Sequence, residues 1–175
     1  MADSPIYRVA FRRRREGKTD YRSRLALLKS GKARLVVRPT LKSVIIQFIS
    51  YGEEGDSVVA SATAKELVKY GWKSATSNIP AAYLAGMLAG KRASDAGVTE
   101  AVLDLGMHKP QPGGVLFAAL KGAIDGGVEI PHDEEMIPEE SRLHGEHIKA
   151  MAKGMFDAVK AKVEAGEPVE NKKEG

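Results

Sequence analysis

Between residues 33 and 63 the chain contains three segments in which apolar and polar residues alternate, a period typical of β-strands. In the first segment Leu35 and Val37 share one face, whereas Arg34, Val36 and Arg38 share the other. The two links between the segments are short and rich in turn residues, so the pattern predicts an antiparallel meander. The predicted strands are 33–38, 43–51 and 57–63.

The segments on either side of the meander have helical patterns. Tyr21, Leu25 and Leu28 form one apolar stripe, which Thr19 can cap and Gly31 can end. The predicted helices are 20–30, 64–70, one that begins after Asn78, and 115–125. The helix after Asn78 is the longest and has Pro80 in its first turn. Buried strands are predicted at 100–105 and 128–130.

A meander whose last strand is followed by helix, strand, helix and strand predicts an α/β fold, in which helices pack on a mixed sheet. The predicted division of the chain is an extended basic arm at 1–18, an α/β domain at 19–131 that includes the first helix, a helical extension at 132–163 and a disordered tail at 164–175. The extension has an amphipathic stripe that can dock on the body or on a neighbouring molecule. Its members are Ile148, Met151, Met155, Val159 and Val163.

Small residues recur at every fourth position in the segment after Asn78, at Ala82, Gly86 and Gly90. In a membrane such a stripe favours helix dimerisation. The uncharged run that contains it covers 12 residues, 79–90, whereas a bilayer-spanning helix needs about 20. We therefore expect a buried helix whose backbone packs closely on the sheet. The first residues lack the apolar stretch of a signal peptide, and no membrane partner is predicted.

Positive charge is concentrated at the N-terminus. Residues 1–42 hold 13 Lys and Arg against three acids, a net charge of +10, and the remainder holds 14 against 20, a net charge of −6. The run of four arginines at positions 12–15 is the centre of this basic arm. Clustered arginines are typical of nucleic-acid binding, because one guanidinium can hold a phosphate through two hydrogen bonds.

A run of like charges is also typical of a solvated tail, a localisation signal or a DNA-binding segment. Tyr7, Phe11 and Tyr21 lie among the cations, and aromatic rings can stack on unpaired bases. The run also continues into a segment with a folded pattern, and Arg outnumbers Lys nine to four in residues 1–42. No helix-turn-helix pattern follows the arm. The composition therefore favours an RNA partner.

Little in the sequence indicates a cofactor, a metal or a small-molecule substrate, and none is predicted. The chain has no cysteine, which excludes disulfides and thiolate metal sites and fits a reducing cytosol. His144, His147 and Glu140 could be imagined as metal ligands, but a surface or RNA-facing position is the favoured interpretation. Gly113 and Gly114 precede a predicted helix without the Gly-Lys-Ser/Thr signature of a nucleotide site.

Eight short motifs resemble the archaeal and eukaryotic form of large-subunit ribosomal protein eighteen, which bears the number five in its older eukaryotic name. They follow one another in family order over residues 7 to about 150, so the resemblance is far more specific than an arginine run alone. The motifs are FRRRREGKTDY at 11–21, GKARLVVR at 31–38, YGW at 70–72, NIPAAYL at 78–84, LDLG at 103–106, LKGAIDGG at 120–127, IPH at 130–132 and GEHI at 145–148.

The resemblance implies a structural protein of the cytoplasmic ribosome with a ribonuclease-H-like α/β fold. It implies that the protein binds 5S rRNA and anchors it to the large-subunit rRNA in the central protuberance, beside universal large-subunit ribosomal protein five and other proteins of that region. The resemblance implies that the arm and the first strands contact the RNA. The predicted RNA-binding residues are Arg8, Phe11, Arg12, Arg13, Arg14, Arg15, Lys18, Thr19, Tyr21, Arg22, Arg24, Lys32, Arg34 and Arg38.

A ribonuclease-H-like nuclease is the alternative from another class, and a general basic nucleic-acid-binding protein is the alternative within the same class. A nuclease needs clustered carboxylates that bind two magnesium ions. Asp104 ends a predicted strand and Asp125 ends a predicted helix, but no acid lies at the centre of a meander strand. Because a shared fold is not a shared function, no catalysis is predicted.

Overall fold

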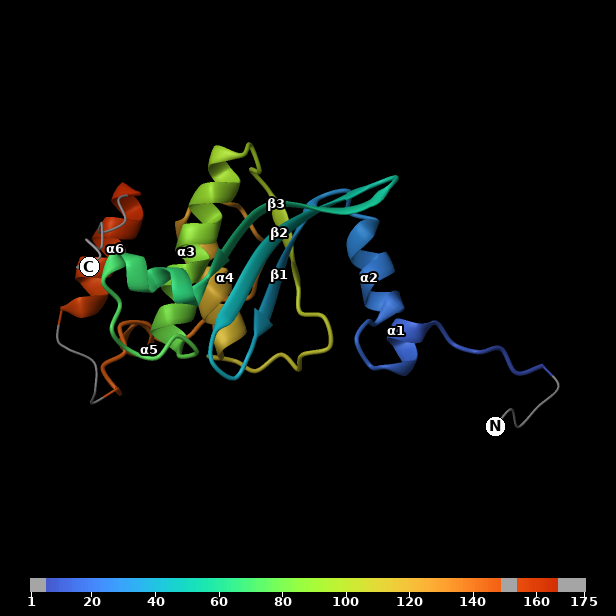
Figure 1. The fold of residues 1–175 in the computed structure, drawn as a ribbon, viewed down its shortest axis with the longest axis horizontal. Helices are drawn as coiled ribbons and strands as arrows, with labels where there is room; N and C mark the ends of the chain where they lie inside the picture. The colour runs from blue at the N-terminus through green and yellow to red at the C-terminus, as the bar shows by residue number, and fades with distance from the viewer. Residues whose placement is uncertain (1–5, 149–153, 167–175) are drawn as a thin grey trace, which may run out of the picture.

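A computed structural model of the chain describes residues 6–148 and 154–166. Its centre is one open, mixed four-stranded sheet, which confirms the predicted α/β class (Figure 1). The strands are β1 (Ala33–Pro39), β2 (Val44–Gly52), β3 (Gly55–Thr63) and β4 (Ala101–Asp104), in the order β3-β2-β1-β4. β1, β2 and β3 form the expected antiparallel meander, and β4 lies parallel to β1.

The predicted strand at 128–130 is wrong. This segment makes one isolated bridge, between Glu100 and Glu129, beside β4. Val128 and Ile130 are buried, so the apolar pattern reported burial correctly. The next residue is Pro131, which has no N–H to continue a ladder, and the backbone pairing ends at the bridge.

Helices α3 (Ile79–Asp95) and α4 (Val115–Asp125) cover one face of the sheet and enclose the core. Leu35, Val37, Ile46 and Phe48 point from the strands into this core and are almost completely buried. α3 begins where expected, because the Asn78 side chain accepts a hydrogen bond from the Ala81 backbone N–H at 3.0 Å. The meander therefore has a helix-covered face and a second face, on which the polar side chains of β1 lie.

The small residues of α3 pack against α4, and the expectation that they pack on the sheet is wrong. An added Cβ at Gly86 would lie 2.2 Å from the Ala119 carbonyl oxygen, and one at Gly90 would lie 2.5 Å from that of Ala123. On α4, an added Cβ at Gly122 would lie 1.9 Å from the Tyr83 carbonyl oxygen. The two helix backbones thus meet at a distance that only glycine permits. Among the described residues no helix is long and apolar enough to cross a membrane.

The segment between the meander and α3 forms a 3-10 helix, η1 (Ala64–Tyr70), where a short helix was expected. Thr63 and Glu66 close it with a reciprocal capping box. Trp72 follows in the core, with only 2% of its surface exposed, and its indole N–H donates to the Ala75 carbonyl at 3.1 Å.

The C-terminal extension contains η2 (Glu134–Met136), α5 (Glu140–Leu143) and α6 (Met155–Ala165). Its stripe docks on the body, since Val159 and Val163 are buried. Phe156 lies between Tyr83 of α3 and His144, with ring centroids 5.7 and 4.7 Å apart, so His144 has a packing partner. Met151 and the tail at 167–175 lie outside the described residues, and α6 includes the first two positions of the predicted tail.

Tyr83 connects the two core helices beneath this extension. Its hydroxyl donates to the Asp125 carboxylate at 2.8 Å, and Lys121 also contacts that carboxylate at 2.8 Å. Burial, together with the hydrogen bond to Asp125, raises the pKa of Tyr83 well above its ordinary value. The tyrosine therefore stays protonated and keeps its role as a donor.

We expect Gly122→Ala to destabilise the protein by about 2 kcal/mol or more, because overpacking a closed helix contact costs roughly 1–3 kcal/mol. Urea unfolding followed by circular dichroism would measure the change. Gly52→Ala is the matched control, since its added methyl would meet only the Gly55 carbonyl oxygen at 3.5 Å. Its effect should stay within about 0.5 kcal/mol. Equal losses in both variants would contradict the close helix contact.

Candidate nucleic-acid interface

The arginine run forms one helical turn, α1 (Arg12–Arg15), where the sequence predicted an extended arm. The i,i+4 ion pair between Arg12 and Glu16, 2.8 Å long, closes this turn, and Lys18 contacts the same carboxyl group at 2.9 Å. These hydrogen bonds, with Arg12 first, lower the pKa of Glu16. Arg14 and Arg15 are exposed, and neither side chain has a bonding partner within the part of the chain that the structure describes.

The second helix, α2 (Tyr21–Leu28), begins one residue later than expected, because Asp20 and not Thr19 is its cap. Asp20 accepts from the Arg22 and Ser23 backbone N–H groups and from the Ser23 hydroxyl. The Ser23 hydroxyl is the largest cause of the lowered pKa of Asp20. Thr19 instead accepts a hydrogen bond from Arg13 Nε at 2.8 Å, which ties α1 to the start of α2.

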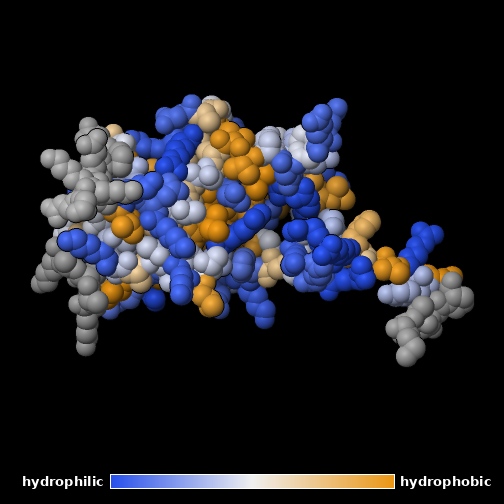
Figure 2. Space-filling model, in the orientation of Figure 1, coloured by the Kyte–Doolittle hydropathy of each residue, from blue (hydrophilic) through white to orange (hydrophobic). Residues whose placement is uncertain are grey.

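An aromatic contact completes this corner of the molecule. The rings of Phe11 and Tyr21 lie 5.2 Å apart at an angle of 53°, a tilted geometry that aromatic pairs favour. Phe11 remains 72% exposed and Tyr21 36% exposed. α1 and α2 lie on the opposite side of the sheet from α3 and α6 (Figure 1), and hydrophilic surface gathers over them (Figure 2).

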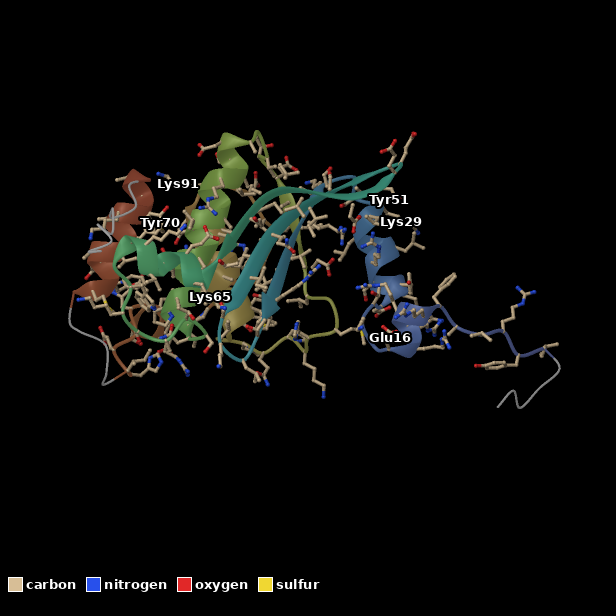
Figure 3. All side chains as sticks on the ribbon, viewed as in Figure 1. Glu16, Lys29, Tyr51, Lys65, Tyr70 and Lys91 are labelled. Atoms are coloured by element: carbon tan, nitrogen blue, oxygen red, sulfur yellow. The ribbon has the colours of Figure 1, made fainter. Side chains whose placement is uncertain are left out.

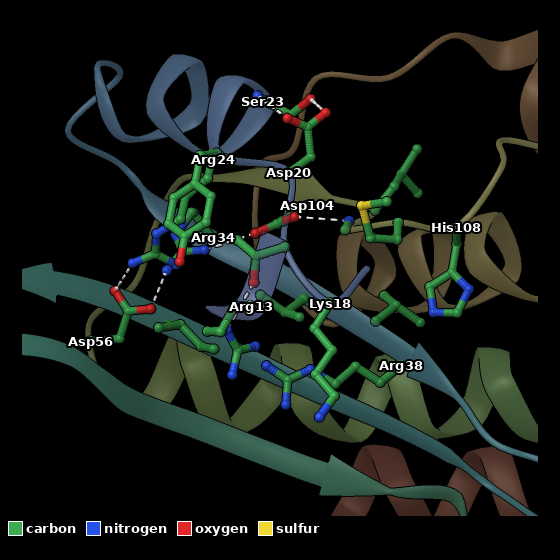
Figure 4. A pocket seen from close by; sticks show the side chains of 18 of the residues that line it. Arg13, Lys18, Asp20, Ser23, Arg24, Arg34, Arg38, Asp56, Asp104 and His108 are labelled. Carbon is green, nitrogen blue, oxygen red and sulfur yellow. Dashed lines mark hydrogen bonds and ion pairs between the residues drawn. The ribbon is translucent and has the colours of Figure 1, made fainter. Parts of the chain in front are cut away.

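Arg34 departs from its predicted role. Only 2% of the residue is exposed, and its two terminal nitrogens bond the carboxylates of Asp104, at 2.7 Å, and Asp56, at 2.8 Å. Arg24 of α2 reaches the other oxygen of Asp56 at 2.9 Å. This network, Arg24–Asp56–Arg34–Asp104, ties α2, β3, β1 and β4 together around the buried Arg34, whose guanidinium is therefore engaged inside the protein and is not on the surface (Figure 4).

The ion pair between Arg24 and Asp56 stabilises the charged form of both residues. The hydrogen bond from Arg24 is the largest cause of the lowered pKa of Asp56, and burial opposes it. The same bond raises the pKa of Arg24. Removing one member of such a set leaves a charge without its partner, which costs far more than the intact set contributes. Arg34 Nε is buried and has no acceptor among the described residues.

A cleft of about 830 Å³ lies above the network, between the arm, the second face of β1 and the loop that follows β4. The side chains of Arg13, Lys18 and Arg38 converge on it (Figure 4). Its carboxylates are already engaged, Asp20 as a helix cap and Asp56 and Asp104 with arginines. The cleft therefore presents positive charge to a ligand, and an RNA phosphate or base suits it.

Most of the other predicted residues lie at the surface. Thr19 and Arg24 are half-buried, and Lys32 forms an ion pair with Glu100. The exposed members of the predicted set are Arg8, Phe11, Arg12, Arg13, Arg14, Arg15, Lys18, Tyr21, Arg22, Lys32 and Arg38.

Sequence reasoning missed the loop after β4. Leu105, Met107 and His108 line the same cleft as the arm. Their position just after a predicted buried strand was the available signal, because loops at strand ends often form sites. The parallel pairing of β4 with β1, which brings this loop to the arm, is a long-range feature that local periodicity does not report.

Comparison with known proteins gives one consistent result. The family described as "Ribosomal large subunit proteins 60S L5, and 50S L18" matches residues 6–97 and 93–133. A protein of Korarchaeum cryptofilum (strain OPF8) named "Large ribosomal subunit protein uL18" is 57% identical over 152 residues, which cover 87% of this chain and 78% of that relative. The matched residues include the arm, the meander and both core helices.

We expect Asp56→Asn to lower the free energy of unfolding at pH 7 by about 1 kcal/mol, since the carboxylate is partly exposed. Because the folded pKa of Asp56 is lowered, its contribution is complete above the unfolded value of about 3.9 and is lost as the pH falls through the folded value. The difference between wild type and variant should therefore shrink below about pH 4. Chemical unfolding between pH 3 and 7 would measure it.

The control is Glu53→Gln, which removes an exposed carboxylate from the same β-hairpin. It should leave the acid limb of the stability curve unchanged. A difference between Asp56→Asn and wild type that stays constant with pH would contradict the ionic role of Asp56.

Proposed function

The chain belongs to the family of large ribosomal subunit proteins 60S L5 and 50S L18, and we propose that it binds 5S rRNA and anchors it to the large-subunit rRNA in the central protuberance. As a member of this family it is a structural, non-enzymatic constituent of the large subunit of the cytoplasmic ribosome. Ribosomal RNA is the partner typical of the family. We further propose universal large-subunit ribosomal protein five and other central-protuberance proteins as its neighbours.

The observation that carries the proposal is the exposed α1 turn on a segment of net charge +10. Arg14 and Arg15 are exposed, and no carboxylate of residues 6–148 or 154–166 bonds them, so phosphate is the acceptor that suits them. Phe11 and Tyr21 offer ring faces beside these cations, which supports contacts with unpaired bases as well. The rest of the chain, with a net charge of −6, positions the arm and does not repel RNA at the arm itself.

The carboxylates considered for a nuclease have other partners. Asp104 bonds Arg34 and the Gly106 backbone N–H, and Asp125 bonds Tyr83 and Lys121. Across residues 6–148 and 154–166 no group of three or more His, Asp or Glu side chains is placed to hold a metal ion. These contacts give the two aspartates structural roles, in agreement with membership of a structural family.

Specificity for 5S rRNA is tested by gel-shift titration of the full chain with 5S rRNA in the presence of competitor transfer RNA. We expect binding that resists the competitor and weakens strongly when residues 1–18, the proposed arm, are removed. Binding that transfer RNA abolishes equally well would indicate a general basic nucleic-acid-binding protein and contradict the proposal.

The role of the arginine run is tested by the salt dependence of binding. If about eight phosphates are neutralised, log K should fall with log salt with a slope of roughly −6 to −7. Arg14→Gln/Arg15→Gln should weaken 5S rRNA binding and reduce the magnitude of this slope by about 1.5 to 2. Fluorescence anisotropy at several salt concentrations would measure both quantities.

Lys65→Gln/Lys69→Gln removes the same number of charges from η1, on the side of the molecule away from Glu16 and α1 (Figure 3). This control should leave the slope unchanged. An equal reduction in both double variants would mean that net charge, and not the α1 turn, sets the affinity.

A further inference from the structure

We infer that the cleft between the arm, β1 and the loop after β4 binds one unpaired nucleotide of the RNA, with the phosphate at its cationic mouth and the base against its apolar floor. The inference rests on the proposed function for the identity of the ligand. The cleft has a volume of about 830 Å³, within the range of about 300–1,000 Å³ typical of small-ligand sites. A duplex is too wide for such a cavity, so the ligand is a base from a loop or bulge.

The mouth of the cleft has the chemistry of a phosphate site. Arg13, Lys18 and Arg38 come from α1, the α1–α2 link and β1, and their charged ends approach one another (Figure 4). Arg38 has no acidic partner within the described parts of the chain, and Arg13 uses only Nε, on Thr19. The terminal nitrogens of both guanidinium groups are therefore available. Like charges brought together in this way are stabilised by an anion between them.

The floor has the chemistry of a base site. Val36 of β1 and Ile49 of β2 line the cleft with 7% and 5% of each residue exposed, and Leu105 and Met107 extend this apolar lining along the loop after β4. Met107 is 56% exposed in the free protein, which leaves apolar surface for a ligand to cover. A thioether and branched aliphatic groups pack well on an aromatic ring. A site for inorganic phosphate alone would not require this apolar lining.

His108 lies at the end of the cleft, and its ring makes no hydrogen bond to another described residue (Figure 4). An imidazole at that position can stack on the base or donate to a phosphate oxygen. The ion pairs of Arg34 with Asp56 and Asp104 hold β1, β3 and β4 together at the cleft, so Val36 and Leu105 are in position before a ligand arrives. Preformed sites lose less conformational entropy on binding.

The test uses the full chain with ¹³C-labelled methionine, valine and isoleucine methyl groups, titrated with adenosine 5′-monophosphate and with uridine 5′-monophosphate. We expect the Met107, Val36 and Ile49 methyl signals to shift with a common, low-millimolar dissociation constant. Met155 on α6 should not shift, since it lies at the other end of the molecule (Figure 1). Inorganic phosphate should move the floor signals little, because the ring current of a base is absent.

Arg38→Gln should weaken binding of the nucleotide about 5-fold or more, whereas Lys42→Gln, a charge loss just beyond β1, should leave it unchanged. Equal shifts with inorganic phosphate would reduce the cleft to an anion site and overturn the inference, as would the absence of shifts at the floor with either nucleotide. Tight 5S rRNA binding without methyl shifts at the cleft would support the proposed function and contradict this inference. Nucleotide binding in the cleft without 5S rRNA binding would support a nucleotide site and contradict the proposed function.

Discussion

The buried guanidinium of Arg34 is the constraint on which the side of the structure that carries the basic arm depends. A charge with 2% of its residue exposed must be compensated, and Asp56 and Asp104 supply that compensation from strands that are far apart in sequence. Asp56 also recruits Arg24, which docks α2 beside the sheet. The position of α2 fixes where the chain leaves the body, and therefore where the α1 turn and its arginines stand. The buried charge of Arg34 thus determines where the exposed arginines of α1 lie.

The other face of the sheet follows a different physical rule. There the core is apolar, and its tightest feature is the contact between α3 and α4, where glycine on each helix lets the two backbones touch. Dispersion and the burial of apolar surface are the main stabilising contributions on this side. The sheet thereby separates two tasks. Its helix-covered face contains the apolar core, and its second face orients the arm and lines the cleft.

Local patterns predicted the meander, both core helices and the basic arm, because alternation, helical stripes and caps are properties of neighbouring residues. What they could not predict required knowledge of partners. Arg34 and Arg38 lie on the same face of one strand, and nothing local distinguishes them. Asp104, 70 residues away, pairs with Arg34, whereas Arg38 has no acidic partner among the described residues. The stripe of Gly86 and Gly90 correctly indicated close packing, but the period of a helix does not say which element it packs on. The segment 128–130 differs, because Pro131 was a local signal that the pairing beside β4 would end after one bridge.

The α1 turn itself is unfavourable without a partner. Arg12 and Arg15 repel each other at i,i+3 spacing, and Glu16 offsets only part of that repulsion, through its ion pairs with Arg12 and Lys18. Arg24 and Arg34, by contrast, have all their charge matched by carboxylates inside the protein. The chain therefore uses arginine in two ways, with matched arginines that fix the architecture and unmatched ones that a polyanion completes. Arg13 ties the α1 turn to the start of the docked helix α2 through Thr19, so the unmatched arginines are already assembled. In the proposed RNA-binding role, phosphates would relieve their repulsion without reorganising the fold.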